Sequence, residues 1–189
     1  LEYYGLKQID WILETANLEV VDVELNDVNG GSFAVTAAHR GRKEISASVE
    51  RLRLQEGDFW ASITELLDDF SSAAAGSIHE LISFIEKEGS RGRTFAGLGA
   101  STKGNVLLQY AKLGPNQVVA IGDVNPDKHG SYTPGSEIPI LPEDEVLRRN
   151  FDYYIVLPWH FRNHFVTNPK FRGRQLVFPL PELAVVTPE

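Results

Sequence analysis

Hydrophobic positions follow two different spacings in the first part of the chain. Between residues 5 and 16, apolar side chains recur every three or four positions, which predicts an amphipathic helix. Leu18–Leu25 and Ser32–Ala38 instead alternate apolar and polar residues, and the turn-forming segment 26–31 separates them. These two runs predict a β-hairpin or a pair of neighbouring strands.

A long helical pattern follows the predicted strands. From about Ile45 to Glu88, apolar residues fall on one stripe at helical spacing. Gly57 and Gly76 interrupt the pattern, and because glycine disfavours helix interiors we expect them to divide or loosen the segment.

Beyond Arg93, short apolar runs alternate with helical segments, a rhythm typical of a parallel sheet with crossover helices. The predicted strands are Thr94–Leu98, Gln117–Gly122, Tyr153–Leu157 and Gln175–Phe178, and the predicted helices are Lys103–Leu113, Pro142–Arg149 and Pro158–Val166. The sequence therefore predicts an α/β fold, in which residues 93–189 form a Rossmann-like, mostly parallel sheet with flanking helices. Residues 1–92, with the first helix, the strand pair and the long helical segment, are expected to pack on this core.

Composition and charge narrow the function classes. The 189 residues carry a formal net charge of −8, which disfavours nucleic-acid binding because phosphate contacts need clustered Lys and Arg. No apolar run reaches the ~20 residues of a membrane helix, so we expect no membrane association. The chain has no cysteine, which excludes disulfides and thiolate zinc sites within it and is compatible with the cytoplasmic location that we expect.

A glycine-rich segment between a predicted strand and a predicted helix carries the strongest functional signal. Gly97, Gly99 and Gly104 permit a sharp turn and a close approach to a phosphate, and the following helix offers free N–H groups. Lys103 adds a positive charge, and Asp123 stands about 20 residues beyond the loop, where Rossmann folds place a carboxylate on ribose hydroxyls. The spacing is G-x-G-x-x-x-x-G rather than G-x-G-x-x-G. Two interpretations stay open: a nucleotide site with NAD(P) as the default ligand, or a tight turn that binds nothing.

Two further segments follow strands at the predicted ligand-binding edge of the sheet. The loop 123–135 is long for its position and offers hydrogen-bond donors, a cation and an aromatic ring, and a Trp-His pair follows the third predicted strand. For each of these residues, a structural role in a rigid loop or a helix cap is the alternative. The candidate ligand-binding residues, with no metal ligand among them, are Gly97, Gly99, Ser101, Lys103, Gly104, Asn105, Asp123, Asn125, Lys128, Tyr132, Trp159 and His160.

Four strings in series resemble a known family. GLGASTKGNVLLQY (97–110), DVNPDKHGSYTPGSEIPI (123–140), DYYIVLPWHF (152–161) and LVFPLPE (176–182) follow one another as in the C-terminal domain of SAM-dependent sugar-nucleotide C-methyltransferases from deoxysugar pathways, of the 3-C-methyltransferase type. The upstream stretch 3–33 is also similar to that family, so the resemblance covers nearly the whole chain. One departure is His129, where members of the family often carry an aromatic residue.

The resemblance implies a C-terminal substrate-binding domain of an enzyme that methylates a nucleoside-diphosphate 4-keto deoxysugar on carbon. In the family, a zinc-binding domain and a SAM-binding domain come first, and the catalytic residues precede the position of Leu1. SAM and zinc are therefore expected outside this chain, which binds neither, holds no catalytic residue and is inactive alone. The implied partners are the nucleotide sugar and the SAM-binding domain of the same polypeptide. A free-standing NAD(P)- or nucleotide-binding module and a purely structural scaffold are the alternatives.

Overall fold

The computed structural model describes residues 4–28 and 31–189. The chain forms two compact units, Leu1–Phe70 (unit 1) and Ser71–Glu189 (unit 2), and the boundary between them falls inside a helix. Among the described helices, none is both long enough and apolar enough to cross a membrane.

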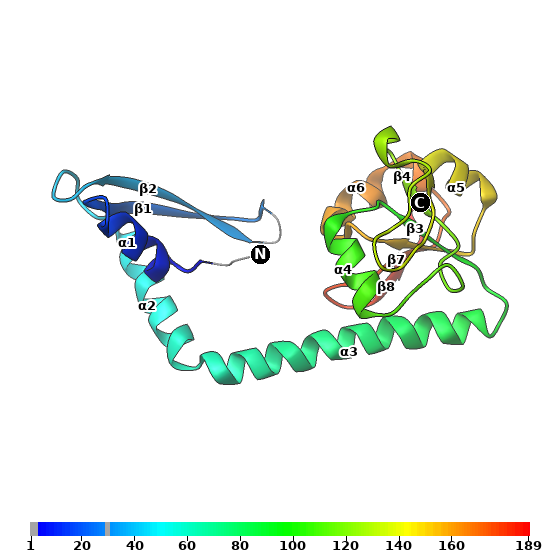
Figure 1. Ribbon diagram of the computed structural model, residues 1–189, viewed down its shortest axis with the longest axis horizontal. Helices are drawn as coiled ribbons and strands as arrows, with labels where there is room; N and C mark the ends of the chain where they lie inside the picture. Colours follow the sequence, from blue (N-terminus) through cyan, green and yellow to red (C-terminus); the bar gives the residue numbers. More distant parts are fainter. Residues whose placement is uncertain (1–3, 29–30) are drawn as a thin grey trace. The chain divides into compact units, whose positions relative to one another are not determined.

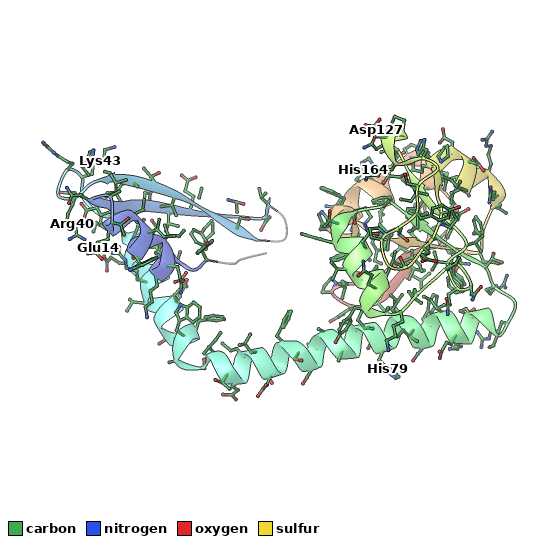
Figure 2. The ribbon with its side chains drawn as sticks, in the orientation of Figure 1. Glu14, Arg40, Lys43, His79, Asp127 and His164 are labelled. Atoms are coloured by element: carbon green, nitrogen blue, oxygen red, sulfur yellow. The ribbon has the colours of Figure 1, made fainter. Side chains whose placement is uncertain are left out.

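Unit 1 is built on two antiparallel strands. The elements are α1 (Leu6–Glu14), β1 (Leu18–Asn26), β2 (Ser32–His39) and α2 (Ala47–Ala61). The predicted first helix and strand pair are confirmed, although Asn29 and Gly30 of the turn lie outside the described residues. An ion pair between Arg40 and Glu14, 2.9 Å long, lies on the surface of this unit (Figure 2). The small core of the unit consists of Leu6, Val20, Val23 and Val49.

The long helical segment divides at Ser62. α2 ends just before this residue and α3 (Ile63–Gly89) begins just after it, because the φ of −111° and ψ of 18° at Ser62 leave the helical range. The expectation that Gly57 and Gly76 divide the segment is wrong, since both lie inside helices. A glycine costs a helix only about 1 kcal/mol, which the neighbouring turns of a long helix offset.

Unit 2 contains a six-stranded sheet in the order β5-β4-β3-β6-β7-β8. All neighbouring strands pair parallel except β7 and β8. Counted from β3, this order is 3-2-1-4-5-6, the order of dinucleotide-binding Rossmann folds, so the predicted α/β class and mostly parallel sheet are confirmed. The strands are β3 (Phe95–Leu98), β4 (Ile121–Asp123), β5 (Ile140–Pro142), β6 (Tyr153–Val156), β7 (Leu176–Phe178) and β8 (Ala184–Val186).

Helices cover both faces of this sheet (Figure 1). α3 and α4 (Thr102–Tyr110) pack on one face, through side chains such as Leu81 and Leu108. α5 (Glu143–Arg149) and α6 (Arg162–Thr167) pack on the other, through side chains such as Val146 and Phe165. With both faces buried, the carboxyl ends of the parallel strands are the part of the sheet that such folds use for ligands.

Several predicted boundaries differ from the observed ones. The strand predicted over Gln117–Gly122 is observed at Ile121–Asp123, because the N–H groups of Gln117 and Val118 both bond the Gly114 carbonyl in a turn. The helix predicted over Pro158–Val166 is a 3-10 turn, η3 (Trp159–Phe161), followed by α6. The prediction missed β5 and β8, the two edge strands, which are only partly buried, whereas the equally short β4 and β7 are fully buried. Two further 3-10 turns, η2 (Pro126–Lys128) and η4 (Pro169–Phe171), lie in loops.

Candidate functional site

The glycine-rich loop lies at the topological switch point of the sheet, where β4 and β6 flank β3 on opposite sides. Gly99 follows β3 with a φ of +77°, a conformation that other residues rarely adopt. A Cβ at this position would lie 2.8 Å from the ring of Pro158, which follows β6. Glycine is therefore required both for the turn and for the close approach of the two loops.

The start of α4 packs closely against the end of the neighbouring strand. A Cβ at Gly104 would lie 2.5 Å from Cβ of Leu157, and a Cβ at Gly97 would lie 2.9 Å from Cγ1 of Ile121. Ser101 caps the helix, because its hydroxyl accepts a hydrogen bond of 3.0 Å from the Gly104 N–H. These two glycines thus set the packing of the loop.

Asp123 ends β4, and only 5% of the surface of this residue is exposed. Oδ2 accepts a hydrogen bond of 2.7 Å from the Ala100 N–H and an ion-paired bond of 3.1 Å from Nζ of Lys128. Oδ1 accepts a bond of 2.8 Å from the Asn125 N–H. Lys128 also donates to the Ala100 carbonyl at 2.9 Å, so the carboxylate and the ammonium together tie the loop after β3 to the loop after β4.

This arrangement gives Asp123 a positioning role within the protein. A ribose that bonded this carboxylate would share it with three intramolecular donors. The carbonyl of the same residue bonds His129 Nε2 at 2.8 Å, so His129 also belongs to the loop scaffold. The assignment of Asp123 to a ribose stays a prediction.

Two cavities open at this end of unit 2. The first, which we call the α4 cavity, has a volume of about 590 Å³ and is rich in hydroxyl and amide groups. It is lined by Ala100, Ser101, Thr102, Asn105, Asp127, Lys128, Ser131, Tyr132 and Ile140.

The second cavity, called here the α6 cavity, has a volume of about 640 Å³ and a largely apolar wall. Ser101 and Lys128 line both cavities, so the two meet at these residues. Asp127 and His164, one from each wall, appear at the same end of unit 2 in Figure 2. The lining residues are Gly99, Ser101, Asp123, Val124, Asn125, Lys128, Glu143, Pro158, Phe161, His164, Phe165, Asn168, Lys170 and Phe171.

The structure brings together seven of the candidate residues along these walls: Gly99, Ser101, Asn105, Asp123, Asn125, Lys128 and Tyr132. Gly97 and Gly104 are packing positions under the loop. Trp159 packs against the apolar cores on both faces of the sheet. Lys103 is exposed near His160, and burial together with the charge of Lys103 lowers the pKa of that imidazole. Trp159, Lys103 and His160 line neither cavity.

Sequence reasoning missed much of the α6 cavity. Its aromatic residues Phe161, Phe165 and Phe171 lie on η3, α6 and η4 respectively, where the sequence predicted only a helix over Pro158–Val166. Glu143, in the first turn of α5, forms an ion pair of 2.6 Å with Lys170, and both residues line this cavity. The available signal was the position of this segment after β6, at the carboxyl edge of the sheet.

No metal-ligand cluster is found in the described part of the chain. Among residues 4–28 and 31–189, no three His, Asp or Glu side chains are grouped as a metal would require. The walls of the two cavities offer hydrogen-bond donors, apolar surface, carboxylates and two cations, of which Lys128 is shared and Lys170 lines the α6 cavity. This combination suits binding of a polar organic ligand.

Comparisons with known proteins identify the family of the chain. The chain matches the family described as C-methyltransferase C-terminal domain over residues 27–181, which include both cavities. It is also similar to the C-methyltransferase NovU of Streptomyces niveus, with 31% identity over 194 residues and 99% of this chain covered. The chain spans 46% of the length of that relative. This chain therefore belongs to the C-methyltransferase C-terminal domain family.

Proposed function

We propose that this domain binds the sugar nucleotide for a SAM-dependent C-methyltransferase that acts on a nucleoside-diphosphate 4-keto deoxysugar. In this proposal the enzyme is cytoplasmic, and its SAM and zinc sites lie in other domains of the same polypeptide. SAM supplies the methyl group when it is bound there. The residues of this chain hold and orient the substrate.

The observation that carries the proposal is the meeting of the two cavities at Ser101 and Lys128. A nucleotide sugar is an elongated ligand with a neutral group at each end and a diphosphate in the middle. Two of the three Nζ–H donors of Lys128 bond Asp123 and the Ala100 carbonyl, which fixes the ammonium in place. We assign its third donor to the diphosphate, with the ends of the ligand in the two cavities.

The proposed chemistry divides between domains. The 4-keto group acidifies the neighbouring C–H bond, and a base outside this chain removes the proton so that carbon can attack the methyl group. This chain contributes by holding the diphosphate and by keeping the sugar in one orientation relative to the other domains. Its own effect should therefore appear in substrate affinity and in the fraction of productive complexes.

The test is steady-state methyl transfer by the intact protein with labelled SAM and a nucleoside-diphosphate 4-keto deoxysugar. Lys128→Gln should raise the KM for the nucleotide sugar about tenfold or more, since a charge-assisted hydrogen bond contributes about 1.5–3 kcal/mol. Lys43→Gln removes an exposed lysine of unit 1 and should leave the KM for the nucleotide sugar unchanged. No methyl transfer by the wild type, or an unchanged KM in Lys128→Gln, contradicts the proposal.

A scaffold role is the second candidate, favoured by the internal bonding of Asp123. In that case the domain supports its neighbours and leaves all ligand contacts to them, and Lys128→Gln lowers thermal stability without changing KM. A free-standing NAD(P) module predicts instead that NAD binds the intact protein more tightly than a nucleotide sugar does. Competition between the two ligands distinguishes these cases.

A further inference from the structure

Asn105, which lines the α4 cavity, carries a buried acceptor without a donor. Oδ1 of Asn105 is shielded from solvent, and no described residue donates a hydrogen bond to it. Asn105 lies in the first turns of α4, where its own N–H bonds the Ser101 carbonyl. A buried polar atom without a partner destabilises a folded protein, so an apolar side chain at this position would serve the fold alone better.

The surroundings of Asn105 indicate the kind of group that would satisfy this oxygen. Tyr132 lines the same cavity with 65% of its surface exposed, which leaves its ring available for stacking. Thr102, Ser131 and Asp127 also line this cavity, and Lys128 lines both it and the α6 cavity. Rotation about the last side-chain torsion of asparagine is broad in energy, so the amide can turn toward a ligand at little cost.

We infer that the α4 cavity holds the nucleobase of the substrate, stacked on Tyr132, and that Asn105 reads its edge by accepting a base N–H at Oδ1. This inference rests on the proposed function and deepens it, because it orients the ligand. The diphosphate then lies at Lys128, and the sugar occupies the α6 cavity. A carboxamide suits a base edge because it offers one acceptor and one donor side by side.

The test compares two probes that differ in one donor. Thymidine diphosphate presents an N3–H, and N3-methylthymidine diphosphate lacks it. Calorimetric titration of the intact wild-type protein should give about tenfold weaker binding of the methylated probe, the usual size for one lost hydrogen bond. Asn105→Leu should bind thymidine diphosphate about tenfold more weakly and should no longer distinguish the two probes.

Stability and a matched control complete the design. Asn105→Leu should melt at the wild-type temperature or above it, because the unpaired acceptor is gone, and Asn105→Ala serves as a second variant if leucine does not fit. Asn116→Leu alters an exposed asparagine in a turn and should bind both probes as the wild type does.

The outcomes separate the inference from the proposed function. If an Asn105 variant still distinguishes the probes, another residue reads the base; if it binds both normally, Asn105 makes no contact. Either result overturns the inference and leaves the proposed function standing. A wild type that binds neither probe nor any nucleotide sugar refutes the proposed function itself.

Discussion

Removal of the Asp123 carboxylate should destabilise unit 2 without any ligand. In Asp123→Ala the Ala100 N–H, in a residue 7% exposed, loses a bond of 2.7 Å and has little access to water. Such an unsatisfied buried donor costs about 1–3 kcal/mol. The Asn125 N–H lies in an exposed residue and can bond water, and the ion pair with Lys128, whose side chain is 40% exposed, contributes at most about 1 kcal/mol. The expected loss is about 1–4 kcal/mol.

Hydrogen exchange of the β3–α4 peptide at increasing urea concentrations reports the free energy of unfolding of unit 2 within the intact protein. Asp123→Asn should fall between the wild type and Asp123→Ala, because a carboxamide retains one acceptor but places a donor against N–H groups. Asp127→Ala, an exposed acid of the same loop, is the control and should change the free energy by less than about 0.5 kcal/mol. If Asp123→Ala lowers the free energy of unfolding by less than about 0.5 kcal/mol, the positioning role is refuted. The predicted contact between this carboxylate and the ligand is then the better interpretation.

Four further results are expected. Gly104→Ala should destabilise unit 2 by about 1–3 kcal/mol through overpacking, whereas Gly76→Ala, in open space on α3, should stabilise the chain by about 0.5–1 kcal/mol in urea unfolding. Lys103→Ala should raise the pKa of His160 in an NMR titration, because one of the two causes that lower it, after burial, is removed. The pKa of Asp152 is lowered by the backbone and then the side-chain hydrogen bond from Thr94, so its stabilisation is fully present above pH 3.8 and is lost as the pH falls through the lower pKa of the folded state. The stability difference between wild type and Asp152→Asn, under about 1 kcal/mol, should therefore shrink as the pH falls below 3.8 in acid unfolding.

The class of fold was predictable because each large element carries its own periodicity. The buried strands β3 and β6 each follow a polar or glycine-containing segment, which marks where they begin. The stripe of apolar residues along α3 is long enough to identify this segment as a helix. β5 and β8 were not predictable, since these edge strands are only partly buried and each pairs with a single neighbouring strand. The break at Ser62 depends on local backbone angles that residue type does not specify.

The candidate site was predictable in position but not in detail. Glycines at 97, 99 and 104 and an acid at 123 placed the loop at the carboxyl edge of the sheet, because those residue types have few other uses in that order. The direction of the Asp123 carboxylate, toward Ala100 and Lys128, depends on how two loops meet. The α6 cavity combines residues from four separate segments, and no spacing along the chain relates them.

Hydrogen exchange of the intact protein with and without a saturating nucleoside-diphosphate sugar tests the central claim most directly. We predict slower exchange on ligand binding in residues 99–110 and 123–132, which carry the meeting point of the two cavities, and no change in β1 or β2. Slower exchange confined to segments outside unit 2, with 99–110 and 123–132 unchanged at saturation, would contradict the claim that this domain binds the sugar nucleotide.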